Sequence, residues 1–317
     1  MLQVVDARTR QADAFRSDVW AGLAQPQKTL PSRWLYDDDG CALFEAITRL
    51  EEYYPTRTET AILKDHAPQI AAFCGRDAVL IEYGAGAGVK TEIVLGALNA
   101  PRLYVPVDIA ADFLERTAAR MRRRFPQLHV HPIATDFTSD FEIPAHVPAE
   151  SRVAFFPGST IGNLDVAETL AFLRRVHHHV GHGGRAIIGA DLKKDVPTLI
   201  AAYDDRQGVT AAFNLNLLAR INRELSGGFA LDQFAHEARW NDGESAIEMH
   251  LVSLKEQVAT VAGRSFVFQA GETIHTESSR KYSVESFSDL AAKSGWQGRA
   301  IWTDPQQRFA LFGLSAA

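Results

Sequence analysis

The chain is organised around a short apolar run that is followed by three alternating glycines, VLIEYGAGAG at residues 79–88. Residues 79–83 suit a strand buried on both faces, because their apolar positions follow one another without polar alternation. Gly84, Gly86 and Gly88 then predict a turn whose backbone angles other residues avoid. A helical pattern follows. This order of elements predicts a cofactor across the turn, and a glycine turn without a ligand is the alternative.

Apolar runs and amphipathic patterns alternate up to Asp195, as they do in a parallel sheet whose strands are connected by helices. A capping residue with Glu three positions later predicts helices that begin at Thr56, Asp112 and Asp165. The first of these helices should run towards Phe73. The expected strands are 79–83, 103–108, 129–133, 153–156, 186–192, 298–302 and 308–314, with a helix at 284–293. The fold class is therefore α/β, with a Rossmann-like sheet.

The N-terminal segment does not follow this alternation. Residues 12–23 have a weak helical pattern, and apolar residues between Leu43 and Leu50 recur at three- and four-residue intervals, which predicts an amphipathic helix. Tyr54 is expected to be extended, because the ring of Pro55 disfavours the α conformation of the residue before it.

An insertion also interrupts the sheet pattern. Residues 199–225 predict helices that are broken near Gly208, and residues 229–268 predict antiparallel strands with a hairpin turn at 241–243. Together with the N-terminal segment, the insertion predicts a second, α+β domain. The expected domains are residues 57–193 plus 282–317 for the sheet, and residues 1–56 plus 194–281 for the second domain.

The spacing of the glycines limits the choice of cofactor. A dinucleotide motif needs glycine where the chain has Val89, and a P-loop needs glycine directly before Lys90. The observed order, Glu82 followed by alternating glycines, resembles motif I of the class I S-adenosylmethionine-dependent methyltransferases. Asp108 ends the next strand, where a carboxylate can accept both ribose hydroxyls. Asp136 and Phe137 follow the third strand and suit the amino group and ring of adenine.

Composition excludes several classes of function. The net charge of −6 argues against a general nucleic-acid or membrane surface. Two cysteines give no disulfide framework and no metal spacing. The N-terminus, with Asp6, Arg8 and Arg10, lacks the apolar core of a signal peptide, and no run of eighteen apolar residues occurs. A cytoplasmic monomer is expected.

Histidines 177–179 and 182 end a predicted helix and point in different directions around it, so no metal site is expected.

Several longer segments together resemble the histidine Nα-methyltransferases of ergothioneine biosynthesis, along essentially the whole chain. They are SRWLYDDDGCALFEAITRLEEYYPTRTE, the glycine loop, PGSTIGN, AAYDDRQGVTAAFN, IEMHL and GETIHTESSRKY. The resemblance implies trimethylation of the α-amino group of L-histidine to hercynine, with S-adenosylmethionine as the methyl donor. It also implies that the sheet domain binds S-adenosylmethionine and the second domain binds the substrate. The glycine loop departs from the family, because Ala87, Gly88 and Val89 replace polar residues.

The resemblance also assigns residues to the site. It implies that Tyr36 and Asn163 are catalytic. The implied cofactor-binding residues are Tyr36, Gly84, Lys90, Asp108, Asp136 and Phe137, and the motif I pattern adds Glu82 and Gly86. The implied substrate-binding residues are Tyr53, Gly158, Asn163, Tyr203, Met249, Glu277 and Ser279. In this family pattern Asn163 and Tyr203 lie near the amino and carboxylate end of histidine, whereas Tyr53, Glu277 and Ser279 face the imidazole.

Two other functions remain open at the level of sequence. One is a related N-methyltransferase that acts on another amino acid or an aromatic amine such as a tryptophan derivative, because the fold does not determine the substrate. The other is a non-catalytic protein that senses S-adenosylmethionine or its product. A complete polar acceptor pocket in addition to the cofactor loop favours an enzyme.

Overall fold

The computed structural model describes residues 2–317, with side chains from Ala12 onward, and the chain folds into two compact units. The insertion unit comprises Met1–Tyr54 and Asp195–Ser278, and the sheet unit comprises Pro55–Lys194 and Ser279–Ala317. The side chains of Asp6, Arg8 and Arg10, on which the expectation about a signal peptide depends, lie outside the described part. Among the described residues, no helix has the length and apolar character needed to cross a membrane.

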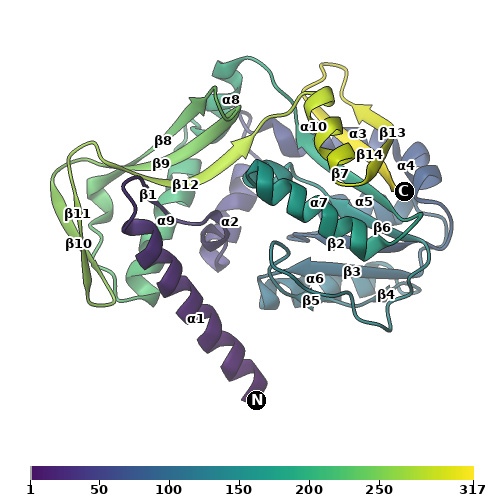
Figure 1. The fold of residues 1–317 in the computed structure, drawn as a ribbon, viewed down its shortest axis with the longest axis horizontal. Helices are drawn as coiled ribbons and strands as arrows, with labels where there is room; N and C mark the ends of the chain where they lie inside the picture. Colours follow the sequence, from purple (N-terminus) through teal and green to yellow (C-terminus); the bar gives the residue numbers. More distant parts are fainter. Residues whose placement is uncertain (1) are drawn as a thin grey trace. The chain divides into compact units, whose positions relative to one another are not determined.

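The sheet unit contains one eight-stranded sheet with the order β13-β14-β7-β6-β2-β3-β4, and β5 also pairs with β3 (Figure 1). β13 and β14 pair antiparallel to each other, and β14 is antiparallel to β7, whereas the other pairings are parallel. β2 lies between β3 and β6, so the strand order reverses at β2, and ligands of open α/β sheets bind outside the carboxyl ends of the strands at such a point. The strands are β2 (Val79–Tyr83), β3 (Leu103–Asp108), β4 (His129–Val130), β5 (Ile133–Ala134), β6 (Arg152–Phe156), β7 (Arg185–Asp191), β13 (Trp296–Thr303) and β14 (Phe309–Ala316).

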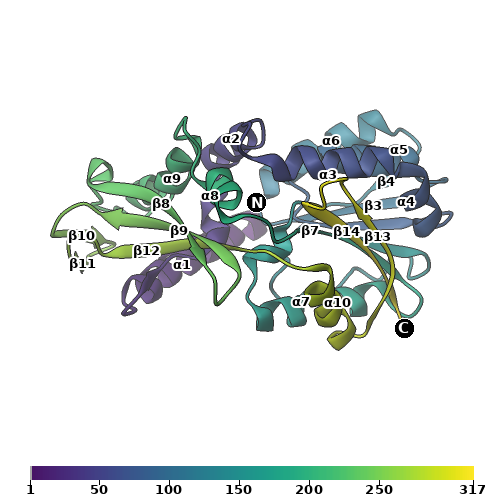
Figure 2. The ribbon, with the colours of Figure 1, turned by 90° about the horizontal axis from the view of Figure 1, so that it is seen from above.

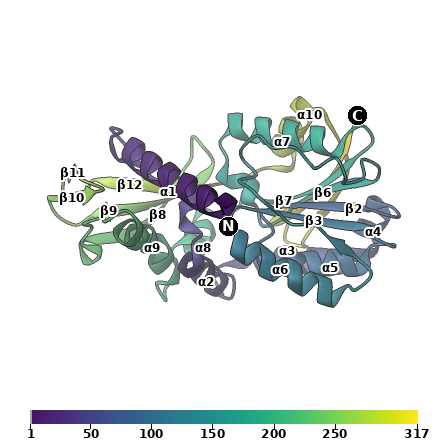
Figure 3. The same ribbon diagram turned by 90° about the horizontal axis from the view of Figure 1, so that it is seen from below.

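Helices cover both faces of this sheet (Figures 2 and 3). On one face α3 (Tyr54–Asp65), α4 (Ala67–Cys74), α5 (Val89–Ala97) and α6 (Ala111–Arg124) form a core with residues such as Leu63, Tyr104 and Phe155. On the other face α7 (Val166–Val180) and α10 (Val284–Lys293) form a second core around Phe172 and Phe287. Because both faces are covered, β2 is buried along its whole length, as its apolar sequence predicts.

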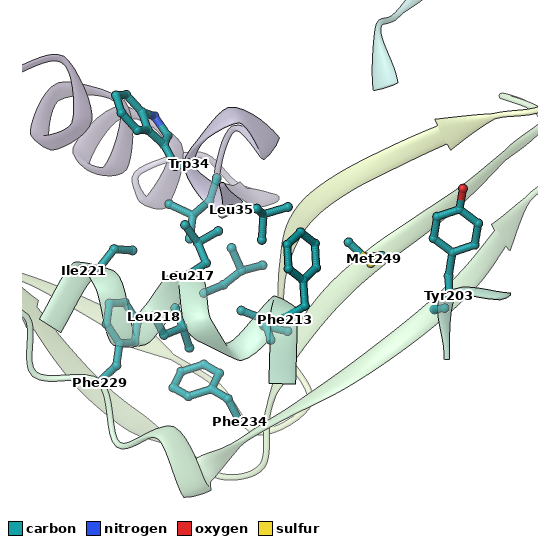
Figure 4. Packing of buried hydrophobic residues seen from close by; sticks show 14 of the residues in the cluster. Trp34, Leu35, Tyr203, Phe213, Leu217, Leu218, Ile221, Phe229, Phe234 and Met249 are labelled. Atoms are coloured by element: carbon teal, nitrogen blue, oxygen red, sulfur yellow. The ribbon is translucent and has the colours of Figure 1, made fainter. Parts of the chain in front are cut away.

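The insertion unit contains a four-stranded sheet with the order β1-β12-β9-β8 and a separate two-stranded ribbon, β10-β11. Its side chains form one core, in which residues of α9 pack with Trp34, Leu35 and two phenylalanines that precede or begin β8 (Figure 4). The elements are α1 (Leu2–Leu23), β1 (Lys28–Thr29), the 3-10 helix η1 (Ser32–Leu35), α2 (Asp38–Ile47), α8 (Val196–Tyr203), α9 (Val209–Glu224), the 3-10 helix η3 (Leu231–Gln233), β8 (Phe234–Asn241), β9 (Ala246–Ser253), β10 (Gln257–Val261), β11 (Arg264–Phe268) and β12 (Thr273–Arg280). β12 continues into the sheet unit, since the division between the units follows Ser278.

The expectations about the segment before the glycine turn were partly wrong. α3 begins at Tyr54, which is therefore helical and not extended. Pro55 occupies the first turn, where its missing N–H is not needed and its fixed φ suits a helix. The single helix expected from Thr56 towards Phe73 is two helices, because Pro68 opens α4 as a new helix after His66.

Two other local expectations were also wrong. The strand expected at residues 129–133 is divided into β4 and β5, with Pro132 between them, because proline cannot donate to the hydrogen-bond ladder. α6 has Ala110 at its N-cap, and Asp112 lies within its first turn, where its charge faces the positive end of the helix. By contrast, Asp165 and Glu168 form the expected capping box of α7.

Candidate active site

Three glycines with positive φ form the turn after β2. Gly84, Gly86 and Gly88 have φ of 69°, 47° and 62°. The turn is held against the neighbouring strand by the N–H of Gly84, which donates to the carbonyl of Val107 over 2.8 Å. A Cβ at Gly88 would lie 2.5 Å from the Cε of Met121 on α6, so a side chain there would require the end of the Met121 side chain to move. The bare backbone of this turn therefore lies at the reversal of the strand order, as a cofactor loop requires.

Glu82 lies beneath the turn and is 1% exposed. Its carboxylate accepts hydrogen bonds from the hydroxyl of Thr91 over 2.6 Å and from the hydroxyl of Tyr104. Burial raises the pKa of Glu82 to about 8, although both hydrogen bonds lower it. Glu82 thus joins β2 to α5 and β3, and its expected role as a cofactor ligand stays a prediction.

Asp108 lies beside the turn at the end of β3. Its Oδ2 accepts from the N–H of Gly86 over 3.1 Å, and its Oδ1 accepts from the N–H of Ala110 over 3.0 Å. Burial raises the pKa of Asp108, against the effect of these hydrogen bonds. Each carboxylate oxygen has a second lone pair, so the geometry is compatible with ribose hydroxyls as further donors.

Asp136 and Phe137 follow β5, which pairs with β3 so that Ala134 is opposite Asp108. The ring of Phe137 packs against Phe156 with a centroid distance of 5.4 Å. A Cβ added to Gly84 would lie 3.5 Å from Cε1 of Phe137, so the ring borders the glycine turn. The structure therefore brings the turn, Asp108 and Phe137 together at one edge of the sheet, and these residues fit the adenosyl part of the cofactor.

The segment after β6 reaches the same edge. Gly158 has a φ of 86°, and Asn163 ends the 3-10 helix η2 (Thr160–Asn163). A Cβ at Gly162 would lie 2.7 Å from the carbonyl oxygen of Arg280, so η2 packs closely against the chain just after Ser279. The structure thus places Asn163 and Ser279, which are distant in sequence, on adjacent segments of the sheet unit.

A group of tyrosines and one carboxylate gathers in the insertion unit. The hydroxyl of Tyr36 donates to Oε2 of Glu277 over 3.5 Å, and the rings of Tyr53 and Tyr203 lie 6.1 Å apart. Burial and the nearby Glu277 carboxylate raise the pKa of the Tyr36 phenol well above its usual value, and Tyr53 and Tyr203 add to this effect. The phenol of Tyr36 is therefore protonated at neutral pH and acts as a hydrogen-bond donor, not as a base.

Met249 belongs to the same unit. It is 1% exposed on β9, and its carbonyl accepts from the hydroxyl of Thr276 on β12 over 3.0 Å, which places it on the strand beside Glu277. Figure 4 shows its side chain in the core that also contains Phe213 and Tyr203. The expected substrate residues are thus divided: Tyr53, Tyr203, Met249 and Glu277 belong to the insertion unit, and Gly158, Asn163 and Ser279 belong to the sheet unit.

The histidines that end α7 have structural partners. His179 is 2% exposed, and its ring nitrogens bond the hydroxyl of Tyr83 over 2.9 Å and the carbonyl of Phe141 over 2.8 Å. His178 instead lies 3.6 Å from Glu142. In the part of the chain that the structure describes, no group of three or more His, Cys, Asp or Glu residues could hold a metal ion.

Sequence reasoning missed Glu59, which is completely buried. It was interpreted as the partner of Thr56 in a capping box, but its carboxylate instead bonds Lys90 over 2.5 Å and the N–H of Gly158. A signal was present, because Glu59, Ile62 and Leu63 have the spacing of one helix face, and the other two are apolar and buried. A carboxylate on such a face needs a specific partner.

Comparison with known proteins shows a likeness over nearly the full length. A family model described as "Histidine-specific methyltransferase, SAM-dependent" matches residues 15–316. The histidine N-alpha-methyltransferase of Mycolicibacterium smegmatis is 41% identical over 305 residues, which are 95% of this chain and 94% of the relative. The protein of the same name from Mycobacterium tuberculosis is 40% identical, with 94% of each chain covered. The ergothioneine biosynthesis protein 1 of Neurospora crassa is 30% identical over 87% of this chain, but over only 32% of its own length.

The first prediction concerns Asp108. Replacing it with Ala should weaken the binding of S-adenosylhomocysteine by about tenfold to a hundredfold, because hydrogen bonds to a charged acceptor contribute roughly 1.5–3 kcal/mol each. Isothermal titration calorimetry measures this change. Asp112→Ala, at an exposed position of the same unit, is the control and should bind normally. Unchanged affinity of Asp108→Ala would remove this residue from the cofactor site.

The second prediction concerns the pH dependence of stability. The pKa of Glu82 is raised to about 8 in the folded state. The protonated side chain therefore contributes fully to the free energy of unfolding below about pH 4.5, and this contribution is lost as the pH rises through 8. Between pH 5 and pH 8 the free energy of unfolding of wild type should fall by roughly 2 to 4 kcal/mol through Glu82, and that of Glu82→Gln should not show this fall. Urea unfolding at both pH values measures this. Glu115→Gln, on the surface of α6, should follow wild type, and a Glu82→Gln curve parallel to wild type would contradict the raised pKa.

Proposed function

Because the chain belongs to the family of histidine-specific methyltransferases that use S-adenosylmethionine, we propose that it methylates the α-amino group of L-histidine three times in succession and forms hercynine. The observation that carries this proposal is the identity of 41% to a histidine N-alpha-methyltransferase over 95% of the chain. A role in ergothioneine biosynthesis belongs to the same proposal, and the name of the Neurospora crassa relative supports it.

The chemistry of the Glu277 side chain suits the imidazole. Its carboxylate is 7% exposed, lies beside the protonated phenol of Tyr36 and can accept the N–H of the imidazole ring. The hydroxyl of Ser279 accepts from the ammonium of Lys281 over 2.8 Å. A hydroxyl that accepts from an ammonium donates its own proton to an acceptor, and the second nitrogen of a neutral imidazole is such an acceptor. A carboxylate acceptor also disfavours an apolar ring, which would exclude water from the charge without donating a hydrogen bond to it.

The reaction requires alignment and a neutral amine more than a strong base. S-adenosylmethionine supplies a methyl group that its sulfonium already activates for displacement. The α-amino group of a peptide has a pKa near 8, and the adjacent carboxylate of a free amino acid raises it, so a minor neutral fraction exists at pH 7 and can be selected by the site. We assign Asn163 and Tyr203 to the amino and carboxylate end of the substrate, and Tyr36 to orientation as a donor. Holding the reacting atoms at about 3 to 3.5 Å in line supplies much of the acceleration.

The chemistry of the nitrogen explains why the sequence of transfers ends. After the first and second methylation the nitrogen regains a lone pair when it loses a proton to solvent. After the third it is quaternary, carries no proton and has no lone pair. The enzyme therefore needs no residue to stop the reaction at hercynine, provided that the site has room for the growing group.

The experiment that tests the proposed function is an assay of product mass. The protein is incubated with S-adenosylmethionine and, separately, with L-histidine, L-tryptophan and tryptamine. We expect histidine to gain three methyl groups and the other two compounds to gain none. Methylation of a tryptophan derivative in place of histidine would identify a related N-methyltransferase, and cofactor binding without any methylated product would identify a non-catalytic binding protein.

A further prediction concerns the substrate contact. Glu277→Ala should raise the KM for histidine by about tenfold to a hundredfold and change the KM for S-adenosylmethionine little, because it removes a charged acceptor of the imidazole. Glu277→Gln keeps an acceptor oxygen and should have the smaller effect. Glu237→Ala, an exposed ion-pair position of the same unit, is the matched control. Steady-state kinetics measures the KM values for histidine and for S-adenosylmethionine, and equal changes in both would contradict the assignment of Glu277 to the imidazole.

A further inference from the structure

Glu59 links two segments of the sheet unit that are far apart in sequence. Its Oε2 lies 2.5 Å from the ammonium of Lys90, at the start of α5. The N–H of Gly158 donates to both carboxylate oxygens, over 2.8 and 3.1 Å. Lys90 belongs to the segment that follows the glycine turn, and Gly158 begins the segment that leads to Asn163. One carboxylate therefore contacts both the cofactor segment and the segment after β6.

The surroundings of Glu59 are shaped to enclose its carboxylate. The side chain is 0% exposed, and that of Lys90 is 17% exposed. A Cβ at Gly189 on β7 would lie 2.2 Å from Oε1 of Glu59, so glycine at this position leaves the space that the carboxylate occupies. A Cβ at Gly158 would lie 3.6 Å from the nitrogen of Lys90. The ammonium, the carboxylate and the peptide of Gly158 thus form one compact cluster.

A buried ion pair such as that of Glu59 and Lys90 is expected to add little to the stability of the fold. Removing a carboxylate and an ammonium from water costs about as much free energy as their attraction returns, and well-packed apolar residues are often equally stable. The pair instead fixes the position of the Lys90 ammonium. A lysine has a flexible stem, and a buried carboxylate restricts its ammonium to one place. Lys90 follows the glycine turn directly in the chain, so an ammonium held there can meet the negative carboxylate of the methionine tail of S-adenosylmethionine.

The segment after β6 is held at two adjacent residues. The N–H of Gly158 is bound by Glu59, and the hydroxyl of Ser159 accepts from the N–H of Asp191 over 2.9 Å. Ser159 has a φ of 58°, a conformation that a residue with a side chain rarely adopts. Two hydrogen bonds, one of them buried, therefore maintain a strained conformation in the segment that continues to Asn163.

We propose that Glu59 is a positioning residue that holds the Lys90 ammonium for the carboxylate of S-adenosylmethionine and, through the peptide of Gly158, holds the segment that carries Asn163. The part that concerns Asn163 rests on the proposed function, whereas the part that concerns Lys90 requires only the cofactor. Glu59 itself contacts neither ligand, so its effects on cofactor and substrate pass through these two partners.

Binding of two adenosyl ligands tests the first part. S-adenosylhomocysteine carries the amino-acid tail, and 5′-methylthioadenosine lacks it. In Glu59→Gln the amide still accepts from Gly158, but it no longer attracts Lys90. Calorimetry should therefore show a loss of about tenfold or more in affinity for S-adenosylhomocysteine and less than about twofold for 5′-methylthioadenosine. Glu115→Gln, which breaks an exposed ion pair of the same unit, should bind both ligands as wild type does.

A double-mutant cycle shows whether Glu59 acts through Lys90. If it does, Glu59→Gln combined with Lys90→Gln should bind S-adenosylhomocysteine no more weakly than Lys90→Gln alone. Fully additive losses would overturn the proposal, and so would an equal loss of affinity for both adenosyl ligands in Glu59→Gln, because that pattern indicates a damaged fold. If Glu59→Gln does not fold, Glu59→Asp is measured in its place. Asp keeps the charge on a shorter side chain, so we expect a smaller loss of affinity that is again confined to S-adenosylhomocysteine.

Kinetics with histidine tests the second part. Glu59→Ala leaves the N–H of Gly158 without its acceptor and should raise the KM for histidine severalfold more than Glu59→Gln does. Equal KM values in the two variants would overturn the link to Asn163. Binding of the adenosyl ligands does not involve histidine. A wild-type protein that binds S-adenosylhomocysteine but leaves histidine unmodified would therefore refute the proposed substrate, while the test of Glu59 and Lys90 would stand.

Discussion

The glycine turn after β2 is the constraint on which the ligand edge of the sheet unit depends. Gly84, Gly86 and Gly88 all have positive φ, and a side chain at Gly88 would displace the end of the Met121 side chain on α6. The turn brings α5 back over the sheet while leaving bare backbone at the point where the strand order reverses. Asp108 and Phe137 border this turn, and Lys90 follows it directly in the chain.

Two buried acidic side chains of the sheet unit hold the segments next to that turn. Glu82 lies below it and is bound by Thr91 and Tyr104, so its carboxylate holds α5 and β3 in place. Glu59 lies on the side of α3 and fixes the start of α5 by binding Lys90. Both carboxylates are buried, and both restrain backbone segments that border the cofactor turn. In the insertion unit, Glu277 has a different environment, because it accepts from the phenol of Tyr36, whose pKa is raised by burial and by this carboxylate.

Most strands of the sheet and the local capping box of α7 were predictable from the sequence, and the polar contacts between distant segments were not. Continuous apolar runs gave β2 and β3 with their observed bounds, since a buried parallel strand needs apolar residues on both faces. The expected start of α3 at Thr56 was wrong, because Pro55 can occupy a first turn and the carboxylate of Glu59 has partners 31 and 99 residues away. Tyr36 and Glu277 are separated by 241 residues, so no local pattern could pair them, and resemblance to a family was the source of that expectation.

The most direct test of the proposed function is to identify the nitrogen that receives the methyl groups. Histidine is converted with S-adenosylmethionine that carries a ¹³C-labelled methyl group, and the product is examined by ¹H–¹³C correlation NMR. We expect a single labelled trimethylammonium signal that correlates with the α-carbon of histidine. Labelled methyl groups on an imidazole nitrogen, or no labelled product despite cofactor binding, would contradict it.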